Sequence, residues 1–434
     1  MKRFAYVSRR MTAAFACVAL AGALAACGSD DSGGDSGDAG SSSSESAAKP
    51  SGDKIVFGAL AGVTGDYAPF TKVAMYANNI AIEDINAEGG VLGKQVELAV
   101  ADTESTGEAA VPAFDRLTEV SKATVLSGGD SDAIIAVLDG IAEKQIPTMC
   151  PYCGADALTP GGDEWLYRLS PADGQLGIAA AQFARDKGYT KASILGQKTD
   201  ASISAVESFK KPFGGPIGGD ICEEVLFDPG KGSYQTEVQK AFSCDPQVVW
   251  ATTGTEAGIP IMREWARRGY GGTWLLSQDM LTPEIAKSTP ELEGKAFGPT
   301  GSMDRSTPAF KAFAEKYKAK SGGEEPSDGL WEAASYDQWV MFALAIEKAK
   351  STDGAKIAAA VPEIANAPGK KCYLYKECLA LVKKGQEIDY YGASGANDLN
   401  DDGDLASPRF TTTELKGGEF VSGEAFDLDP SLSE

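Results

Sequence analysis

INAEGGVLGKQVEL, which spans residues 85–98 of this 434-residue chain, is the stretch that decides the fold. The apolar residues that lead into it recur at helical spacing, and the glycines at positions 89 and 90 provide a typical helix C-terminus. The run Val96-Glu97-Leu98 is typical of a strand. The segment therefore predicts a helix, a tight turn and a strand in direct succession.

The same alternation of strands and helices continues on both sides of this segment. In the first half of the chain, strands are expected at 55–60, 96–100, 124–126 and 146–149, with helices at 74–85, 110–120 and 133–142. In the second half, a helical pattern follows each of four strands, near 192–195, 222–227, 248–251 and 274–276. Two such sets predict an α/β fold with two doubly wound parallel-sheet lobes.

The last part of the chain is too short for a third domain, so it is expected to complete the two lobes. It contains helical patterns at 308–318, 331–350 and 355–364 and a β-rich end from residue 388. Asp402-Gly403 is expected to form a hairpin turn between the last strands.

The N-terminus resembles that of an exported bacterial lipoprotein. Four basic residues precede the apolar stretch 11–26, which is too short to span a bilayer, and Leu24-Ala25-Ala26-Cys27 follows as a small-residue cleavage site. We expect a signal peptide at 1–26, a lipid anchor on Cys27, a flexible linker at 27–53 and an extracytoplasmic location at the cell membrane. An ordinary secretory signal with an incidental cysteine is the alternative.

Composition excludes several classes of function. Without the signal, the chain has 36 basic and 62 acidic residues, a formal net charge of −26, which argues against nucleic acid as a partner. Histidine is absent, which excludes a Ser-His-Asp triad and removes the commonest transition-metal ligand. No enzymatic activity, metal or cofactor is expected.

Several motifs, taken together in their order, resemble the leucine/isoleucine/valine-type periplasmic binding proteins, the receptors of branched-chain amino acid and amide ABC importers. Besides 85–94, they are found at 62–65, 127–131, 146–147, 263–269 and 390–395. The resemblance implies the type I periplasmic binding protein fold, with three crossovers near Leu169, Gly301 and Asp398. Lobe 1 would comprise 54–169 plus 302–398, and lobe 2 would comprise 170–301 plus 399–434.

The resemblance also implies ligand-binding residues in lobe 1. Ser131, next to Asp130, matches the serine that holds the ligand's carboxylate; a plain helix N-cap is the alternative. Gly154, followed by Ala155, stands where relatives usually have a threonine, so that hydroxyl is missing. Tyr67 and Phe70 match an aromatic cover over the ligand, although either could equally be a core residue.

In lobe 2, the loop containing Thr253, Gly254 and Thr255 matches a ligand loop, and Asp279 matches the carboxylate that receives the ligand's amino group. A helix cap before Pro283 is the alternative role for Asp279. Ser202 lies where relatives have an aromatic residue. Because Asp130 and Asp132 flank the anion site, a small polar ligand with an amine or amide end is at least as compatible as leucine, isoleucine or valine.

Six cysteines remain after the signal and the anchor, and an even number in an exported protein indicates disulfides. We expect the pairs Cys150 with Cys153, Cys222 with Cys244, and Cys372 with Cys378. The C-x-x-C spacing of the first pair leaves a thiol-disulfide oxidoreductase as an alternative, although no helix opens directly from it.

The sequence thus predicts a monomeric, lipid-anchored receptor that closes two lobes over a small amino acid or amide. Its expected partners are the ligand, the membrane, and the permease and ATPase subunits of an ABC importer. A ligand sensor of the same fold, coupled to signalling, is the second hypothesis.

Overall fold

The computed structural model describes residues 54–159, 165–327, 329 and 331–432. The expected signal peptide, linker and lipid-bearing Cys27 lie outside these residues and stay predictions. No helix in the described part of the chain is long and apolar enough to cross a membrane.

The segment at 85–98 folds as its sequence predicts. Helix α1 (Ala68–Ala87) ends just before two glycines, Gly89 and Gly90, both with positive φ, and the N–H of Gly90 donates to the carbonyl of Ile85 at 3.0 Å. A Cβ on Gly90 would collide with the backbone carbonyl of Lys94. Only glycine therefore suits this turn, and it delivers the chain directly into strand β2 (Val96–Asp102).

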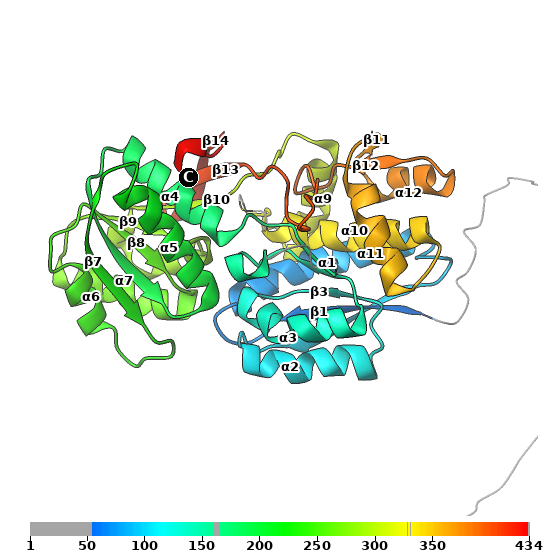
Figure 1. Ribbon diagram of the computed structural model, residues 1–434, viewed down its shortest axis with the longest axis horizontal. Helices are drawn as coiled ribbons and strands as arrows, with labels where there is room; N and C mark the ends of the chain where they lie inside the picture. The colour runs from blue at the N-terminus through cyan, green and yellow to red at the C-terminus, as the bar shows by residue number, and fades with distance from the viewer. Residues whose placement is uncertain (1–53, 160–164, 328, 330, 433–434) are drawn as a thin grey trace, which may run out of the picture. The chain divides into compact units, whose positions relative to one another are not determined.

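The first sheet has the strand order β2-β1-β3-β4-β5, and all its strands are parallel. The remaining members are β1 (Ile55–Ala61), β3 (Val125–Ser127), β4 (Thr148–Cys150) and β5 (Leu166–Arg168). One face packs on α2 (Gly107–Asp115), which continues into a π-helical turn, and on α3 (Ser131–Lys144). These helices lie beneath β1 and β3 in Figure 1.

The other face of this sheet is covered by helices from a distant part of the chain. Phe57 of β1 stacks on Trp339 with ring centroids 5.4 Å apart, so the buried helix α10 (Trp331–Ala349) joins the first sheet's core together with α1. The same core includes side chains of α9 (Pro308–Ser321), α11 (Gly354–Ala365) and α12 (Tyr375–Lys383). Helix α12 and strand β11 (Lys370–Cys372) were not expected from the sequence. Strand β12 (Ile388–Tyr390), which pairs with β11 in parallel, begins the β-rich end that was expected from residue 388.

The second sheet has the order β14-β13-β10-β9-β8-β6-β7. Its parallel strands are β6 (Lys191–Gln197), β7 (Asp220–Phe227), β8 (Val248–Thr252), β9 (Thr273–Leu276) and β10 (Ala296–Gly301). Its helices are α4 (Asp173–Asp186), α5 (Asp200–Gly214), α6 (Gln235–Ala241), α7 (Thr255–Arg268) and α8 (Pro283–Ser288). The predicted α/β class is confirmed.

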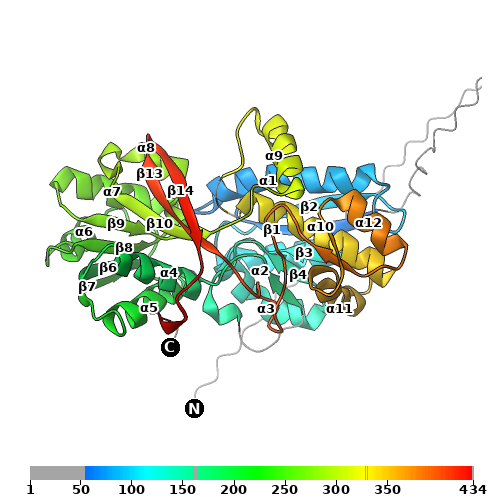
Figure 2. The same cartoon turned by 90° about the horizontal axis from the view of Figure 1, so that it is seen from above.

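Two antiparallel strands, β13 (Phe410–Lys416) and β14 (Glu419–Phe426), extend this sheet beyond β10, as Figure 2 shows. Their turn is formed by Gly417 and Gly418, so the expectation that Asp402-Gly403 joins the last strands is wrong. A turn does occur at Asp402, between Leu399 and Leu405, which form an isolated antiparallel bridge. The carbonyl of Gly403 instead accepts from the N–H of Arg168 at 2.8 Å. This backbone contact holds Gly403 against strand β5, away from the last hairpin.

The three disulfides join the cysteines in the expected pairs: Cys150 with Cys153, Cys222 with Cys244, and Cys372 with Cys378. Cys150 and Cys153 are fully buried, which leaves no access for the substrate of an oxidoreductase.

Candidate functional site

The carboxyl ends of strands from both sheets face one pocket, the place where open α/β sheets bind ligands. From the first sheet's side, Asp66 and Tyr67 follow β1, Ser105 follows β2, and Asp132 lies in the first turn of α3. Ser105 fixes the loop after β1, because its hydroxyl accepts from the N–H of Tyr67 at 3.0 Å and donates to the carbonyl of Thr64 at 2.7 Å.

From the second sheet's side, the lining includes Gly254 and polar residues at three strand ends and at the N-termini of α4, α5 and α7. They include Asp173, Gln197, Thr199, Ser202, Thr252, Thr253, Gly254, Ser277, Gln278 and Asp279. The cavity that these side chains enclose is small, with a volume of about 50 Å³. The pocket is therefore narrow, and most of its lining residues are polar.

Five of the residues expected at the site line this pocket: Tyr67, Ser202, Thr253, Gly254 and Asp279. Asp279 does not cap the following helix, because the hydroxyl of Thr282 accepts from the N–H of Ile285 at 3.3 Å and is the N-cap of α8.

The other six expected residues lie behind the lining. Phe70 is buried against the rings of Tyr67 and Trp331, with centroids 6.2 and 5.0 Å away. Thr255 is buried and its hydroxyl contacts that of Thr282 at 3.3 Å. Four more surround the N-terminus of α3: Asp130, Ser131, Gly154 and Ala155.

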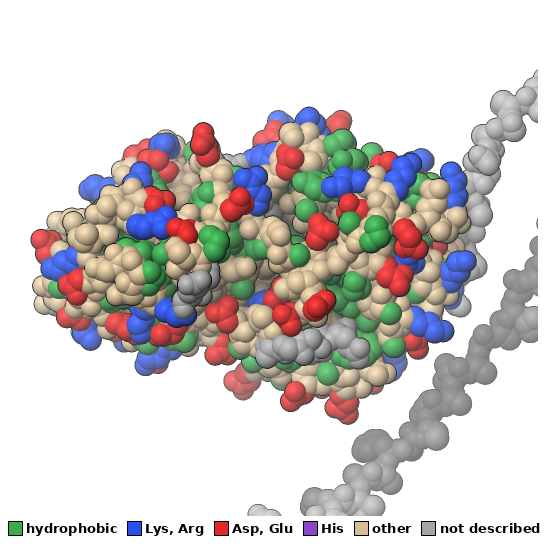
Figure 3. All heavy atoms as spheres, turned by 45° about the horizontal axis from the view of Figure 1, so that its top comes forward, with side chains coloured by type: hydrophobic (Ala, Val, Ile, Leu, Met, Phe, Trp, Pro, Cys, Tyr) green, Lys and Arg blue, Asp and Glu red, His purple; other side chains and the backbone are tan. Residues whose placement is uncertain are grey.

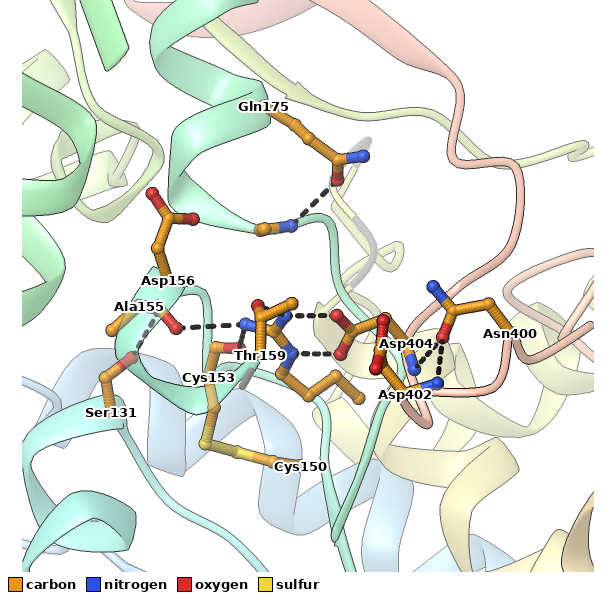
Figure 4. A network of polar contacts seen from close by, with 12 residues as sticks. Ser131, Cys150, Cys153, Ala155, Asp156, Thr159, Gln175, Asn400, Asp402 and Asp404 are labelled. Atoms are coloured by element: carbon orange, nitrogen blue, oxygen red, sulfur yellow. Dashed lines mark hydrogen bonds and ion pairs between the residues drawn. A yellow bond between two sulfur atoms is a disulfide. The ribbon is translucent and has the colours of Figure 1, made fainter. Parts of the chain in front are cut away.

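At the N-terminus of α3, these groups are engaged with one another. The carboxylate of Asp130 is the N-cap and accepts from the N–H of Ala133 at 2.9 Å. The hydroxyl of Ser131, 2% exposed, accepts from the N–H of Ala155 at 3.0 Å, as Figure 4 shows. The loop that carries Gly154 is thereby held against the helix.

A buried arginine fixes the same loop from behind. The guanidinium of Arg168, 1% exposed, donates to both carboxylate oxygens of Asp404, to the carbonyl of Ala155 at 3.0 Å and to the hydroxyl of Thr159. In Figure 4 Asp404 and Thr159 lie together, between Asn400 and the disulfide loop. The guanidinium of Arg168 therefore stabilises the fold by linking this loop to Asp404.

Burial and neighbouring carboxylates raise the pKa of the pocket aspartates. Burial raises the pKa of Asp279 to about 7, with further contributions from Asp130, Asp66 and Asp132 and an opposing hydrogen bond from Tyr67. Burial, followed by the charge of Asp279, raises the pKa of Asp173 well above its usual range. The pKa of Asp66 and that of Asp132 are raised as well, in both cases mainly by burial.

Sequence reasoning missed several lining residues, among them Asp66, Asp173, Gln197 and Ser277. Gln197 and Ser277 could have been found from the sequence, because Gln197 ends β6, a strand that was predicted, and Ser277 directly follows β9, another. Asp173 was harder to find because it begins the helix after a crossover and not a loop of the repeating strand-helix pattern.

Two doubly wound sheets whose strand ends meet at one polar pocket define a two-lobed solute-binding protein. The chain belongs to the periplasmic binding protein family, whose profile, described as "Periplasmic binding protein", matches residues 54–369. This family places the protein outside the cytoplasm.

Individual relatives agree with this assignment. An amino acid binding protein from Pseudomonas aeruginosa is 25% identical over 315 residues, which cover 70% of this chain and 81% of the relative. A solved leucine-binding protein from Thermotoga maritima has a TM-score of 0.75 at 24% identity, covering 87% of this chain and 99% of that one. A branched-chain amino acid transporter substrate-binding protein from Streptococcus pneumoniae, in complex with isoleucine, has a TM-score of 0.74 at 19% identity, covering 86% and 100%.

Proposed function

We propose that this protein is the solute-binding receptor of an ABC importer and that it captures a small amino acid or amide in the pocket between its two lobes. The observation that carries the proposal is the double origin of the pocket: Tyr67 and Asp132 come from the first sheet's side, and Ser202 and Asp279 from the second. A solute bound there contacts both lobes.

Such a site couples ligand binding to closure, because the ligand stabilises the arrangement in which both sets of side chains reach it. The N–H of Asp200 in α5 donates to Asp132 in α3 at 3.3 Å, so the two lobes already touch beside the pocket. The proposed lobes are 54–169 plus 302–398 and 170–301 plus 399–434, joined by crossovers near Leu169, Gly301 and Asp398.

Asp279 is the proposed partner of the ligand's amino group. An ammonium group next to it would gain a charge-assisted hydrogen bond and would favour the ionised carboxylate. The hydroxyl of Tyr67, which hydrogen-bonds to Asp279, completes this end of the site.

Delivery to a permease is the part of the proposal suggested by the similar Streptococcus pneumoniae structure, which is a substrate-binding protein of a transporter. A lipid on Cys27 would keep the receptor at the membrane surface, close to the permease and ATPase subunits. A permease that docks on both lobes would distinguish the liganded from the empty receptor.

Calorimetry and thermal shift against amino acids and their amides test the proposal. We expect at least one of these solutes to raise the melting temperature, and Asp279→Asn to weaken its binding by about ten-fold or more. Asp228→Asn, at an exposed aspartate that pairs with Lys198, is the matched control. The absence of heat and of thermal shift with every solute would contradict the proposal.

A further inference from the structure

The pocket has an unusual balance of charge. Four aspartates line it, Asp66, Asp132, Asp173 and Asp279, whereas none of the described lining residues is a lysine or arginine and the chain has no histidine. On the face of the molecule in Figure 3, by contrast, acidic and basic side chains are interspersed. The described lining of the pocket therefore has acidic side chains and no basic one, unlike the surface around it.

Several polar atoms in this pocket have no partner within the described structure. Asp173 is only 8% exposed, and its buried Oδ2 accepts no hydrogen bond. The Oδ1 of Asp66 and the hydroxyl of Ser277, both at the pocket wall, are likewise buried without a partner. Because buried, unsatisfied acceptors are costly, these oxygens are available for donors supplied by a ligand.

The end of the pocket next to α3 is closed to a carboxylate. Helix N-termini generally favour anions, but Asp130 already caps this one, and Asp132 and Asp173 face the same end. The carboxylate of Asp173 lies so close to Gly154 that even a Cβ there would collide with it. Burial raises the pKa of Asp173 more than the charge of Arg168 lowers it, and the guanidinium of Arg168 hydrogen-bonds to Asp404.

A metal ion does not fit these carboxylates. Among the described residues, no group of three or more Asp, Glu, Cys or His side chains is arranged to hold one. The aspartates come from four different segments of the chain and are spread around the pocket. Such a distribution favours an extended cation with several N–H donors over a point charge.

We propose that the ligand is a small organic cation without a free carboxylate: an amine, diamine, guanidine or amino acid amide whose N–H groups reach both Asp279 and Asp173. This inference rests on the proposed receptor function and replaces the free amino acid in its ligand class by a cation that has no carboxylate. Burial and mutual repulsion raise the pKa of both carboxyl groups, and a bound cation would relieve that repulsion.

Matched sets of solutes that differ only in the carboxylate test this proposal on the purified protein. The sets are leucine with leucinamide and isopentylamine, ornithine with putrescine, and arginine with agmatine, each titrated by calorimetry at constant pH and salt. We expect the tightest binder to lack a carboxylate and to bind at least about ten-fold more tightly than its parent amino acid. Tighter binding of the parent would overturn the cation proposal and leave the receptor function standing.

The variant Asp173→Asn keeps the shape of the side chain and removes its charge. We expect this variant to bind the preferred cation about ten-fold or more weakly, with an unchanged circular dichroism spectrum. Asp228→Asn should leave the affinity unchanged. Unchanged affinity in Asp173→Asn would contradict the role of this carboxylate.

If none of these solutes binds, mass spectrometry of the solute released from freshly purified protein will show whether the natural ligand carries a carboxylate. A released cation without a carboxylate supports the proposal, and a released carboxylic acid overturns it. No binding and no released solute would count against the receptor function as well.

Discussion

Gly154→Ala tests whether Asp173 fills the space beside residue 154. A Cβ at this position would lie 2.8 Å from the Oδ2 of Asp173 and closer still to its Oδ1 and Cγ. Ordinary contacts between such atoms begin at about 3.5 Å, so the Asp173 side chain must move. Its backbone N–H donates to the carbonyl of Gly154 at 2.5 Å, which prevents the main chains from separating freely.

Overpacking of a buried site costs about 1–3 kcal/mol, and replacing glycine by alanine returns about 0.4–1 kcal/mol by restricting the unfolded chain. We therefore expect Gly154→Ala to lower the free energy of unfolding by about 1.5 kcal/mol. Gly232→Ala is the control, because a Cβ there has no heavy atom within 4 Å and its φ is not positive. It is expected to be neutral or slightly stabilising.

Urea unfolding of a double-mutant cycle separates the collision from other effects. In an Asp173→Ala background the colliding atoms are gone, so Gly154→Ala should no longer destabilise the protein, and the two substitutions should couple by about 1.5 kcal/mol. Equal costs in the two backgrounds, within about 0.5 kcal/mol, would refute the assigned position of the Asp173 carboxylate.

Three further predictions concern stability. Asp337 is fully buried and accepts four hydrogen bonds from the segment 390–394, two of them from backbone N–H groups, so Asp337→Ala should cost about 4 kcal/mol in urea unfolding. The pKa of Asp279 is about 7 in the folded protein against 3.8 as its ordinary value, so the folded state retains the proton longer. The unliganded protein should therefore lose stability as the pH rises from about 4 to about 7, and thermal unfolding of Asp279→Asn should show a shallower loss. Cys222 and Cys244 are 22 residues apart, so replacing both with serine should cost about 3 kcal/mol, and a cost near zero would contradict the structural role of their disulfide.

Much of the fold could be predicted from the sequence because its signals are local. The glycines at 89 and 90 end a helix through their own backbone conformation, and most strands of the two sheets are short apolar runs that need no distant partner to be identified, although β10 was not expected. The pairing of Cys222 with Cys244 was expected on the assumption that their strands are neighbours; the pair is present, but β6 lies between β7 and β8 in the sheet. Helix α12 was missed because it is short and lies between two strands of three residues each.

The candidate site was only partly predictable. Tyr67 and Asp279 follow strands, so their positions at a sheet edge could be expected from the strand pattern. That Ser131 would be engaged by the N–H of Ala155, and that Phe70 would be buried beneath Trp331, depends on how separate elements pack.

The sequence by itself determined the α/β class and most of the order of strands and helices, because hydrogen bonding and apolar periodicity act within about 20 residues along the chain. Only the tertiary structure decided the charge of the pocket. It brings Asp66 and Asp132 to the same cavity as Asp173 and Asp279, and it commits Arg168 to Asp404. Electrostatic forces depend on distances in space between residues far apart in sequence, and these distances exist only once the two lobes are packed together.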